Sequence, residues 1–393
     1  MVKTVNPRFV RPLVFLFALA LAWPLAPHPV FSGTLPRFSL WISLFALIDG
    51  LLSPILILTG GIALVSLFKS RFFCRWLCPV GLIVSLLSWR RRIPVWTAKF
   101  PKIGVWIAPL GLGAALLDFP LLGWMDPLVI FNAALLPLAG GGGEIGKTLL
   151  LLTAPLLWLS LSLCVPFLWC TKICPLGALQ DILTALRLSF LKEGKTGERG
   201  SRGLCRRAFL GIGLGAGYRW VLKPTDLDRT DTPLRPPHTG GESAFLSRCV
   251  RCGACAKACP VGIISAGGTG GGIASFLAPE LHFSDSYCLP ECSACSRACP
   301  TGALSPFVPD EKVKRPIGLA RVERDRCLLE QGIECMACQE SCSYRALRVE
   351  WSEEREINRI HIQADLCIGC GSCEYTCIAT PKAIRVVSRK ESV

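Results

Sequence analysis

Histidine is scarce in this sequence, and its scarcity limits the chemistry that the chain can do. The 393 residues include only 4 His, and none of them lies inside a long apolar stretch: His28, His238, His282 and His361. A haem held by two histidines within an apolar segment therefore has no ligands. The sequence also lacks a C-x-x-C-H motif, which excludes covalently attached haem. We expect no haem, so redox chemistry in this chain would need another cofactor.

Acidic residues are few in the first part of the chain. The formal net charge is +15, and almost all of it lies in residues 1–244, which carry 25 Lys and Arg against 11 Asp and Glu. Residues 245–393 carry 18 against 17 and are nearly neutral. A charge confined in this way argues against a nucleic-acid partner. It favours basic loops that flank membrane helices.

Long apolar runs, by contrast, are plentiful. Hydrophobic residues make up 51% of the chain, and a membrane helix needs roughly 20 apolar residues in succession. Four stretches approach this requirement: Leu13–Pro27, Leu51–Phe68, Ile103–Leu122 and Thr148–Phe167. Lys and Arg gather on the loops that would share one side of a bilayer. The sequence therefore predicts an α-helical multi-pass membrane domain of about four helices, residues 1–192, in contact with membrane lipid.

Cysteine is the most informative residue type. The chain has 22 cysteines, and sixteen of them form four runs with short spacers after residue 245. The runs are Cys249, Cys252, Cys255 and Cys259; Cys288, Cys292, Cys295 and Cys299; Cys327, Cys335, Cys338 and Cys342; and Cys367, Cys370, Cys373 and Cys377.

This spacing is typical of [4Fe–4S] clusters. Three neighbouring thiolates hold three irons from one loop, and the fourth iron takes a cysteine from another run. Gly253 and Gly371 let the backbone approach inorganic sulfide. Zinc would use two separate pairs of ligands, and disulfides between residues three apart would be strained. Short β-prone stretches follow the runs, at residues 261–265, 302–307, 347–351 and 384–387. We therefore predict an α+β polyferredoxin domain, residues 245–393, that binds four clusters.

A second, smaller group of cysteines lies in the first part of the chain. The motif C-x-x-x-C-P occurs twice, and a glycine follows each proline two residues later. Because the motif is duplicated, we predict that its cysteines meet and form one more iron–sulfur site; the alternative is four ordinary reduced thiols. The cysteines are Cys74, Cys78, Cys170 and Cys174, and the glycines are Gly81 and Gly177.

Two families share these motifs. Residues 71–79, the segment Trp124-Met-Asp-Pro127 and residues 170–179 resemble the NapH family, the membrane quinol dehydrogenase component of periplasmic nitrate reductase systems. Residues 234–237, 245–260 and 327–342 resemble the NapG/MauM ferredoxin-type family. Together the resemblances cover nearly the whole chain. They imply a natural fusion of two partner proteins in the bacterial cytoplasmic membrane.

Between the two parts we predict a linker, residues 193–244. Its segment Arg206-Arg207-Ala-Phe-Leu210 resembles the twin-arginine signal by which the NapG/MauM family is exported in the folded state. The resemblance implies a periplasmic ferredoxin domain. The alternative is a basic linker that leaves this domain in the cytoplasm.

The resemblance also implies a function. Electrons would pass from the quinol pool, through quinol dehydrogenase activity, to a separate periplasmic redox partner such as a nitrate-reductase-type enzyme. The alternative is an electron donor for the assembly of a partner metalloenzyme. By resemblance to four-cluster ferredoxin subunits, the first cysteine run would share clusters with the fourth run, and the second with the third.

Overall fold

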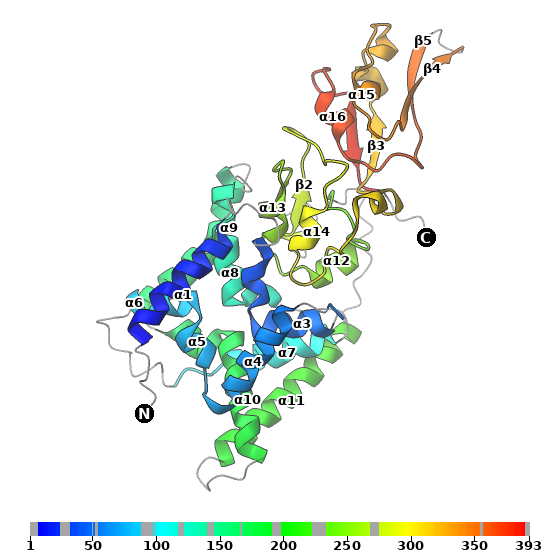
Figure 1. Ribbon diagram of the computed structural model, residues 1–393. Coiled ribbons are helices and arrows are strands. Elements are labelled where there is room, and N and C mark those ends of the chain that lie inside the picture. Colours follow the sequence, from blue (N-terminus) through cyan, green and yellow to red (C-terminus); the bar gives the residue numbers. More distant parts are fainter. Residues whose placement is uncertain are drawn as a thin grey trace.

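The fold was analysed in a computed structural model of the chain. It describes residues 7–23, 32–48, 50–51, 54–87, 97, 99–116, 122–139, 145–165, 167–190, 198–221, 233–267, 275–353 and 357–389. Parts of the predicted linker and of all four predicted membrane stretches lie outside these residues. The described residues form a helical region at one end of an elongated molecule and ferredoxin-like modules towards the other end (Figure 1).

The helical region is built from short elements that follow the apolar runs. Its first half contains α1 (Pro7–Ala22), α2 (Thr34–Arg37), α3 (Leu40–Ile48), α4 (Ile55–Phe68), α5 (Phe72–Trp76) and α6 (Pro79–Leu87). Its second half contains α7 (Gly104–Ala115), η3 (Gly123–Met125), α8 (Pro127–Ala134), η4 (Pro137–Ala139), α9 (Ile145–Cys164), the π-helix η5 (Trp169–Ile173), α10 (Pro175–Phe190) and α11 (Glu198–Val221).

The predicted membrane domain is wrong. None of the helices formed by the described residues combines the length and the apolar character that a membrane crossing requires. The helix α3, which precedes the predicted stretch Leu51–Phe68, has 9 residues, and α4, within that stretch, has 14. At 1.5 Å per residue these helices are roughly 14 and 21 Å long, against a hydrocarbon core of roughly 30 Å. The finding overturns both the four-helix membrane domain of residues 1–192 and the multi-pass placement in the bacterial cytoplasmic membrane.

The helix α11 passes through the segment that the sequence assigned to a linker. Glycines allow it to pack closely on α7: a Cβ atom on Gly113 would lie 2.0 Å from the backbone oxygen of Ile212, and one on Gly215 would lie 2.1 Å from that of Leu110. Backbones can approach this closely only where no side chain separates them. The Arg206-Arg207 pair lies on α11 with both side chains exposed.

The first six elements of the cysteine-rich part of the chain form what we call the proximal ferredoxin module, residues 242–314. They are α12 (Glu242–Arg248), α13 (Ala254–Ala258), β1 (Ile264–Ala266), β2 (Pro279–Leu281), α14 (Ala294–Ala298) and the 3-10 helix η7 (Pro309–Lys314). The strands β1 and β2 pair antiparallel, with Ile264 opposite Leu281. Residues 302–307, expected to be β-prone, form no strand.

The remaining elements form the distal ferredoxin module, residues 319–387. They are β3 (Leu319–Val322), η8 (Arg324–Arg326), η9 (Leu329–Gln331), α15 (Ala337–Glu340), β4 (Leu347–Ser352), β5 (Ile357–Ile362), α16 (Ser372–Thr376) and β6 (Ile384–Val387). Both strand pairs are antiparallel: β4 with β5, and β3 with β6. The β-prone stretches at 347–351 and 384–387 are confirmed as strands, whereas pattern reasoning missed β2, β3 and β5.

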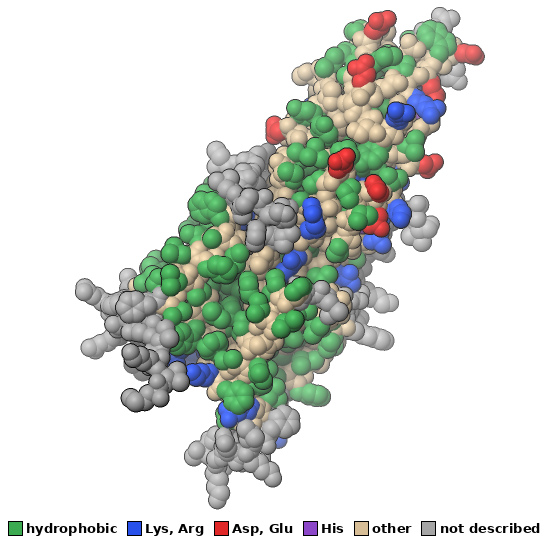
Figure 2. All heavy atoms as spheres, viewed as in Figure 1, with side chains coloured by type: hydrophobic (Ala, Val, Ile, Leu, Met, Phe, Trp, Pro, Cys, Tyr) green, Lys and Arg blue, Asp and Glu red, His purple; other side chains and the backbone are tan. Residues whose placement is uncertain are grey.

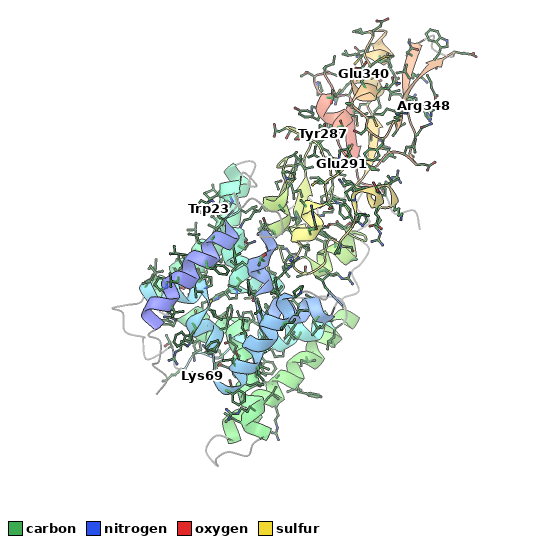
Figure 3. The ribbon with its side chains drawn as sticks, viewed as in Figure 1. Trp23, Lys69, Tyr287, Glu291, Glu340 and Arg348 are labelled. Atoms are coloured by element: carbon green, nitrogen blue, oxygen red, sulfur yellow. The ribbon has the colours of Figure 1, made fainter. Side chains whose placement is uncertain are left out.

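The hydrophobic core of the helical region continues into the proximal module. Trp41, Phe45 and Leu128 are almost fully buried in it, and the same cluster includes Val250 and Ala298 of the proximal module. The distal module has a core of its own. One contact between the modules is made by the rings of Tyr287 and Tyr375, whose centroids are 5.9 Å apart; Figure 3 labels Tyr287 at this junction.

Candidate iron–sulfur sites

Four cysteines line one cavity in the proximal module, which we call site A. Cys249, Cys252 and Cys255 come from the first run, and Cys299 comes from the second. The other lining residues are mostly apolar. Three thiols from one loop and one from another run are the donor set that a [4Fe–4S] cluster needs.

The distal module contains two such cavities. Site C is lined by Cys342 from the third run and by Cys367, Cys370 and Cys373 from the fourth. Site D is lined by the first three cysteines of the third run together with the last of the fourth: Cys327, Cys335, Cys338 and Cys377.

The remaining ferredoxin cysteines meet as site B, which consists of Cys259, Cys288, Cys292 and Cys295. Burial raises the pKa of the Cys295 thiol, and the nearby charges of the other three raise it further. Site B adjoins site A, because the charge of Cys295 also contributes to the raised pKa of Cys255, after burial and the thiols of site A.

These groupings contradict the expected pairing of the runs. The first run shares its sites with the second, and the third with the fourth. The reason is the pair of hairpins: β1 and β2 fold the chain back between the first two runs, and β4 and β5 do so between the last two. Consecutive elements joined by short connections usually lie side by side. The last three cysteines have the same spacing in every run, and this spacing carries no information about the partner run.

Local backbone geometry shapes each cysteine loop. Gly253 and Gly371 precede α13 and α16 with φ values of 72° and 85°, in the left-handed region that suits glycine. The backbone also donates to ligand sulfurs: the Ala346 N–H lies 3.4 Å from the Cys342 Sγ, and the Ala320 N–H lies 3.5 Å from the Cys367 Sγ. Hydrogen bonds of this kind stabilise thiolates.

Sites B, C and D follow one another along the molecule. The backbone N–H of Cys288, in site B, donates to the carbonyl of Cys370, in site C, at 2.9 Å. Site C in turn adjoins site D, because the charge of Cys338 contributes to raising the pKa of Cys373. The order along the two modules is therefore A, B, C, D.

The two C-x-x-x-C-P motifs meet in the helical region, as predicted, and form site H, which consists of Cys74, Cys78, Cys170 and Cys174. Burial raises the pKa of Cys74 to about 11 and that of Cys170 to about 12. Burial also raises the pKa of Cys174, with further contributions from the other three thiols. Buried thiols of this kind would be protonated on their own, and the positive charge of iron would stabilise them as thiolates.

The glycine of each motif fits tightly beside the cysteines. A Cβ atom on Gly81 would lie 2.7 Å from the Cys74 carbonyl oxygen, and one on Gly177 would lie 3.1 Å from that of Cys170 and 3.7 Å from the Cys74 Sγ. The Gly81 N–H also donates to the Cys78 Sγ at 3.4 Å. The repeated glycines therefore keep space beside the thiols, and at least one supplies a backbone donor to them.

Two polar side chains that sequence reasoning missed fix the geometry of site H. The Gln180 Nε2 donates to the Cys74 Sγ at 3.2 Å, and its Oε1 accepts from the Phe73 N–H at 3.0 Å. The Arg71 guanidinium forms an ion pair with Asp181 at 2.6 Å and donates to the Cys170 carbonyl at 2.9 Å. Only their positions close to the motifs could have singled them out.

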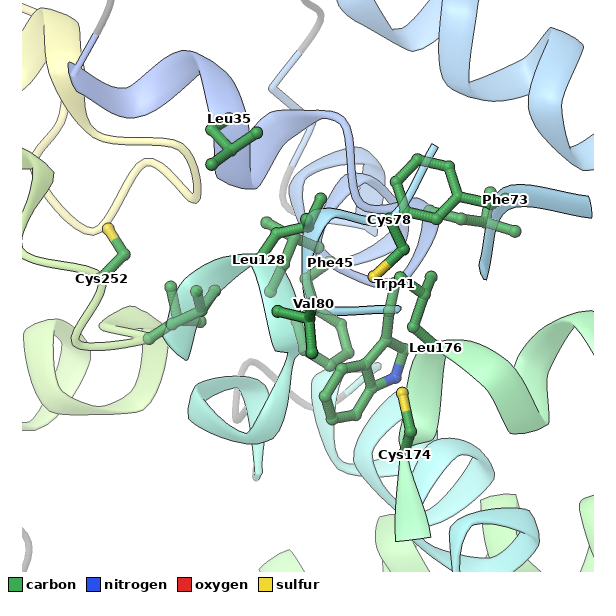
Figure 4. Packing of buried hydrophobic residues seen from close by; sticks show 14 of the residues in the cluster. Leu35, Trp41, Phe45, Phe73, Cys78, Val80, Leu128, Cys174, Leu176 and Cys252 are labelled. Carbon is green, nitrogen blue, oxygen red and sulfur yellow. The ribbon is translucent and has the colours of Figure 1, made fainter. Parts of the chain in front are cut away.

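Sites H and A lie in the same hydrophobic cluster. Cys78, Cys174 and Cys252 all belong to it, and in the view of Figure 4 Leu128 and Val80 lie between the first two and Cys252. Figure 4 also shows the Trp41 ring between Cys78 and Cys174. The Trp41 Nε1 is buried without a hydrogen-bond partner. A cluster sulfide could accept from such a donor.

Polar contacts join the helical region to the ligand loops of site A. The Asn132 side-chain amide donates to the Cys252 carbonyl at 2.9 Å, and Arg37 donates to the Cys299 carbonyl at 2.8 Å. The buried Lys257 donates to the Asn132 carbonyl at 2.5 Å, and burial lowers its pKa to about 7. Two ligand loops are thus fixed by the helical region.

None of these sites is arranged for a single ion. Within the described residues, no three His, Cys, Asp or Glu side chains converge closely enough to hold one metal ion. At sites A, C and D the thiols instead line the walls of a cavity. A cube-shaped cluster needs this wider arrangement, because each of its four irons takes one thiolate.

Comparison with protein families agrees with iron–sulfur chemistry in both parts of the chain. A model described as a 4Fe-4S dicluster domain matches residues 248–303 and 333–380, which contain fifteen of the sixteen ferredoxin cysteines. A model described as a 4Fe-4S binding domain matches residues 52–96 and 148–192, which contain all four cysteines of site H. The chain is therefore an iron–sulfur protein of the ferredoxin type.

Known relatives narrow this class. The ferredoxin-type protein MauM of methylamine utilization from Methylobacillus flagellatus is 35% identical over 165 residues, 40% of this chain and 70% of the relative. The ferredoxin-type protein NapG of Escherichia coli is 31% identical over 166 residues, 39% of this chain and 70% of the relative. The ferredoxin-type protein NapF of the same species is 35% identical over 144 residues, which are 37% of this chain and 79% of the relative.

The chain belongs to this family of ferredoxin-type proteins through its C-terminal part. No solved structure matches it. The resemblance of the N-terminal half to NapH stays a prediction.

Proposed function

We propose that the chain is an electron conduit with five [4Fe–4S] clusters in the order H, A, B, C, D. The observation that supports it most is the succession of the four ferredoxin sites, each adjoining the next, with site H in the same hydrophobic cluster as site A. The sixteen ferredoxin cysteines would hold the clusters of sites A to D, and the helical quartet would hold the fifth. Such clusters accept and release one electron each, and the residues around them set their potentials.

For the donor we propose quinol, with entry at site H. The helical region carries many exposed apolar side chains, among them Ile57 at 80%, Leu157 at 72% and Phe68 at 63% exposure, and Figure 2 shows such side chains over much of its visible face. Apolar surface on this scale marks a contact with an apolar partner. We propose that this partner is lipid, in which quinol is dissolved.

For the acceptor we propose a separate redox protein that docks near site D. This site is farthest along the succession, and all four of its cysteines are only partly buried. Ile378, which lines the cavity, is 66% exposed. A docking protein could therefore reach the neighbourhood of the cluster. A nitrate-reductase-type enzyme is one such acceptor.

Reduction by a soluble quinol analogue tests this proposal. In the full chain, purified without oxygen, we expect quinol to bleach the visible absorbance of the clusters. In the Cys74→Ser/Cys174→Ser variant, quinol should no longer reduce the ferredoxin clusters, although dithionite still does. The exposed Cys164 offers a matched control, and Cys164→Ser should behave like the unchanged chain. Equal quinol reduction in the double variant would refute entry at site H.

A further inference from the structure

One lysine lies directly against a ligand of site B. Lys312, on η7, is 1% exposed, although lysines are almost never fully buried without a partner. Its Nζ lies 3.6 Å from the Cys288 Sγ and donates to the Leu289 carbonyl at 2.5 Å. The contact brings a cation to a thiolate ligand from outside the cysteine runs.

No carboxylate within the described residues accounts for the burial of Lys312. The neighbouring Glu311 carboxylate instead accepts from the backbone N–H of Val308 at 3.2 Å. A buried ammonium group is costly unless a nearby negative charge compensates it. Thiolate sulfur is the negative group in contact with Lys312, so the cluster of site B is its natural counter-charge.

Among the described residues of the distal module, no comparable buried cation contacts a cysteine of site C or site D. At site D, the charges that act most strongly on the Cys338 thiol are those of Cys327, Cys335 and Cys377. At site C, Arg389 donates to the Cys367 carbonyl at 3.1 Å, but its side chain is exposed. A solvated cation acts much more weakly than a buried one, because water screens its charge.

Resting on the proposed cluster at site B, we propose that Lys312 raises the reduction potential of that cluster above those of the distal module. Reduction adds one electron, and hence one negative charge, to the cluster. A buried cation in contact with a ligand sulfur stabilises this more negative state. Electrons that enter the chain therefore collect at site B before they occupy sites C and D.

A redox titration followed by electron paramagnetic resonance tests the role of Lys312. The Lys312→Met variant keeps the length of the side chain and removes its charge; Lys312→Gln removes the charge and keeps a donor for Leu289. In both we expect the reduction equilibrium constant of one cluster to fall at least tenfold, a shift of about 59 mV for one electron. Lys312→Arg should retain most of the original potential.

The structure supplies a control on the same helix. Lys314 is two residues further on and is exposed, so Lys314→Met should leave every midpoint potential unchanged. The signal of site B is assigned by its loss in a Cys259→Ala variant.

Unchanged potentials in Lys312→Met and Lys312→Gln chains with full iron content would overturn the inference. So would an equal shift in Lys314→Met. A wild-type chain with too little iron for a cluster at site B would instead refute the proposed function.

Discussion

The proximal and distal modules have the same cysteine motifs but different surroundings. The proximal module shares a core with the helical region, which contacts its ligand loops through Arg37 and Asn132, and Lys257 of the module donates to Asn132. The distal module has its own core, and all the thiols of site D are partly exposed. Similar motifs therefore make a site A that is anchored to the helical region at one end and a site D that has no buried cysteine at the other.

Under the proposed function, this difference would give the two modules distinct tasks. Burial and fixed polar contacts hold a cluster at a constant geometry and let nearby charges act strongly on its potential. Nearby charges act less strongly on the potential of an exposed cluster, but a partner protein can approach it. Under the proposed function, the proximal module would receive electrons from site H and the distal module would deliver them.

The largest effect should come from removing a ligand that links two runs. Cys259→Ala should remove the cluster of site B and leave sites C and D intact, because Cys259 meets only the second run. Electron paramagnetic resonance of the reduced chain measures this as the loss of one signal. A damaged distal cluster in place of site B would restore the pairing of the first run with the fourth.

A smaller effect should follow the titration of a buried acid in the helical region. Asp126 caps α8 by accepting from the Leu128 N–H at 2.8 Å and from the Ser39 hydroxyl at 2.5 Å, and burial raises its pKa to about 6. The pKa of this carboxyl is 3.8 in the unfolded chain and about 6 in the folded one. Between these two pH values the folded chain holds a proton that the unfolded chain has lost, so the free energy of unfolding falls as the pH rises.

Asp126→Asn keeps an acceptor for the Leu128 N–H, places an amide donor beside the Ser39 hydroxyl oxygen, and removes this titration. We expect the free energy of unfolding of the variant to rise by roughly 3 kcal/mol relative to that of the unchanged chain as the pH rises towards 7, because the pKa shift is linked to stability. Denaturant unfolding in the absence of oxygen measures this difference. Parallel pH profiles for the two chains would mean that Asp126 titrates normally.

Loosening the shared core should cost somewhat less. A Cβ atom on Gly33 would lie 1.7 Å from the Ala298 carbonyl oxygen, so Gly33→Ala must push the helical region and the proximal module apart. Overpacking of this kind costs roughly 1–3 kcal/mol. Hydrogen exchange should rise in the proximal module and stay unchanged in the distal one. The control is Gly60→Ala, where a Cβ atom meets nothing within 4 Å; a similar response to both changes would contradict the shared core.

The smallest effect is expected at the surface of the distal module. Arg326 and Glu323 form an ion pair in which both side chains are more than two-fifths exposed. Exposed pairs contribute little because water and salt screen them. Arg326→Gln should therefore change the free energy of unfolding by less than roughly 0.5 kcal/mol. A loss of several times this size would show that the distal surface is more tightly coupled than its exposure suggests.

Sequence patterns were reliable where the chemistry is local. The four cysteine runs and the duplicated C-x-x-x-C-P motif located the sites, because the ligands of a loop follow one another in sequence. The membrane prediction failed because it counted apolar residues. In the structure these residues belong to helices such as α4, with 14 residues, and many of their apolar side chains are exposed.

Other features depend on tertiary contacts and left no pattern to find. Two hairpins decide which cysteine runs share a site, and pattern reasoning found only some of the strands in these hairpins. Lys312 lies 24 residues from Cys288 in sequence, and nothing nearby distinguishes it from the exposed Lys314. Gln180 reaches Cys74 across 106 residues.

Iron and acid-labile sulfide content of the full chain, purified without oxygen, tests the five-site account most directly. Five [4Fe–4S] clusters require about 20 irons per chain, and the Cys74→Ser/Cys174→Ser variant should contain about 16. About 16 irons in both proteins would contradict a cluster at site H, and about 8 would contradict half of the ferredoxin sites.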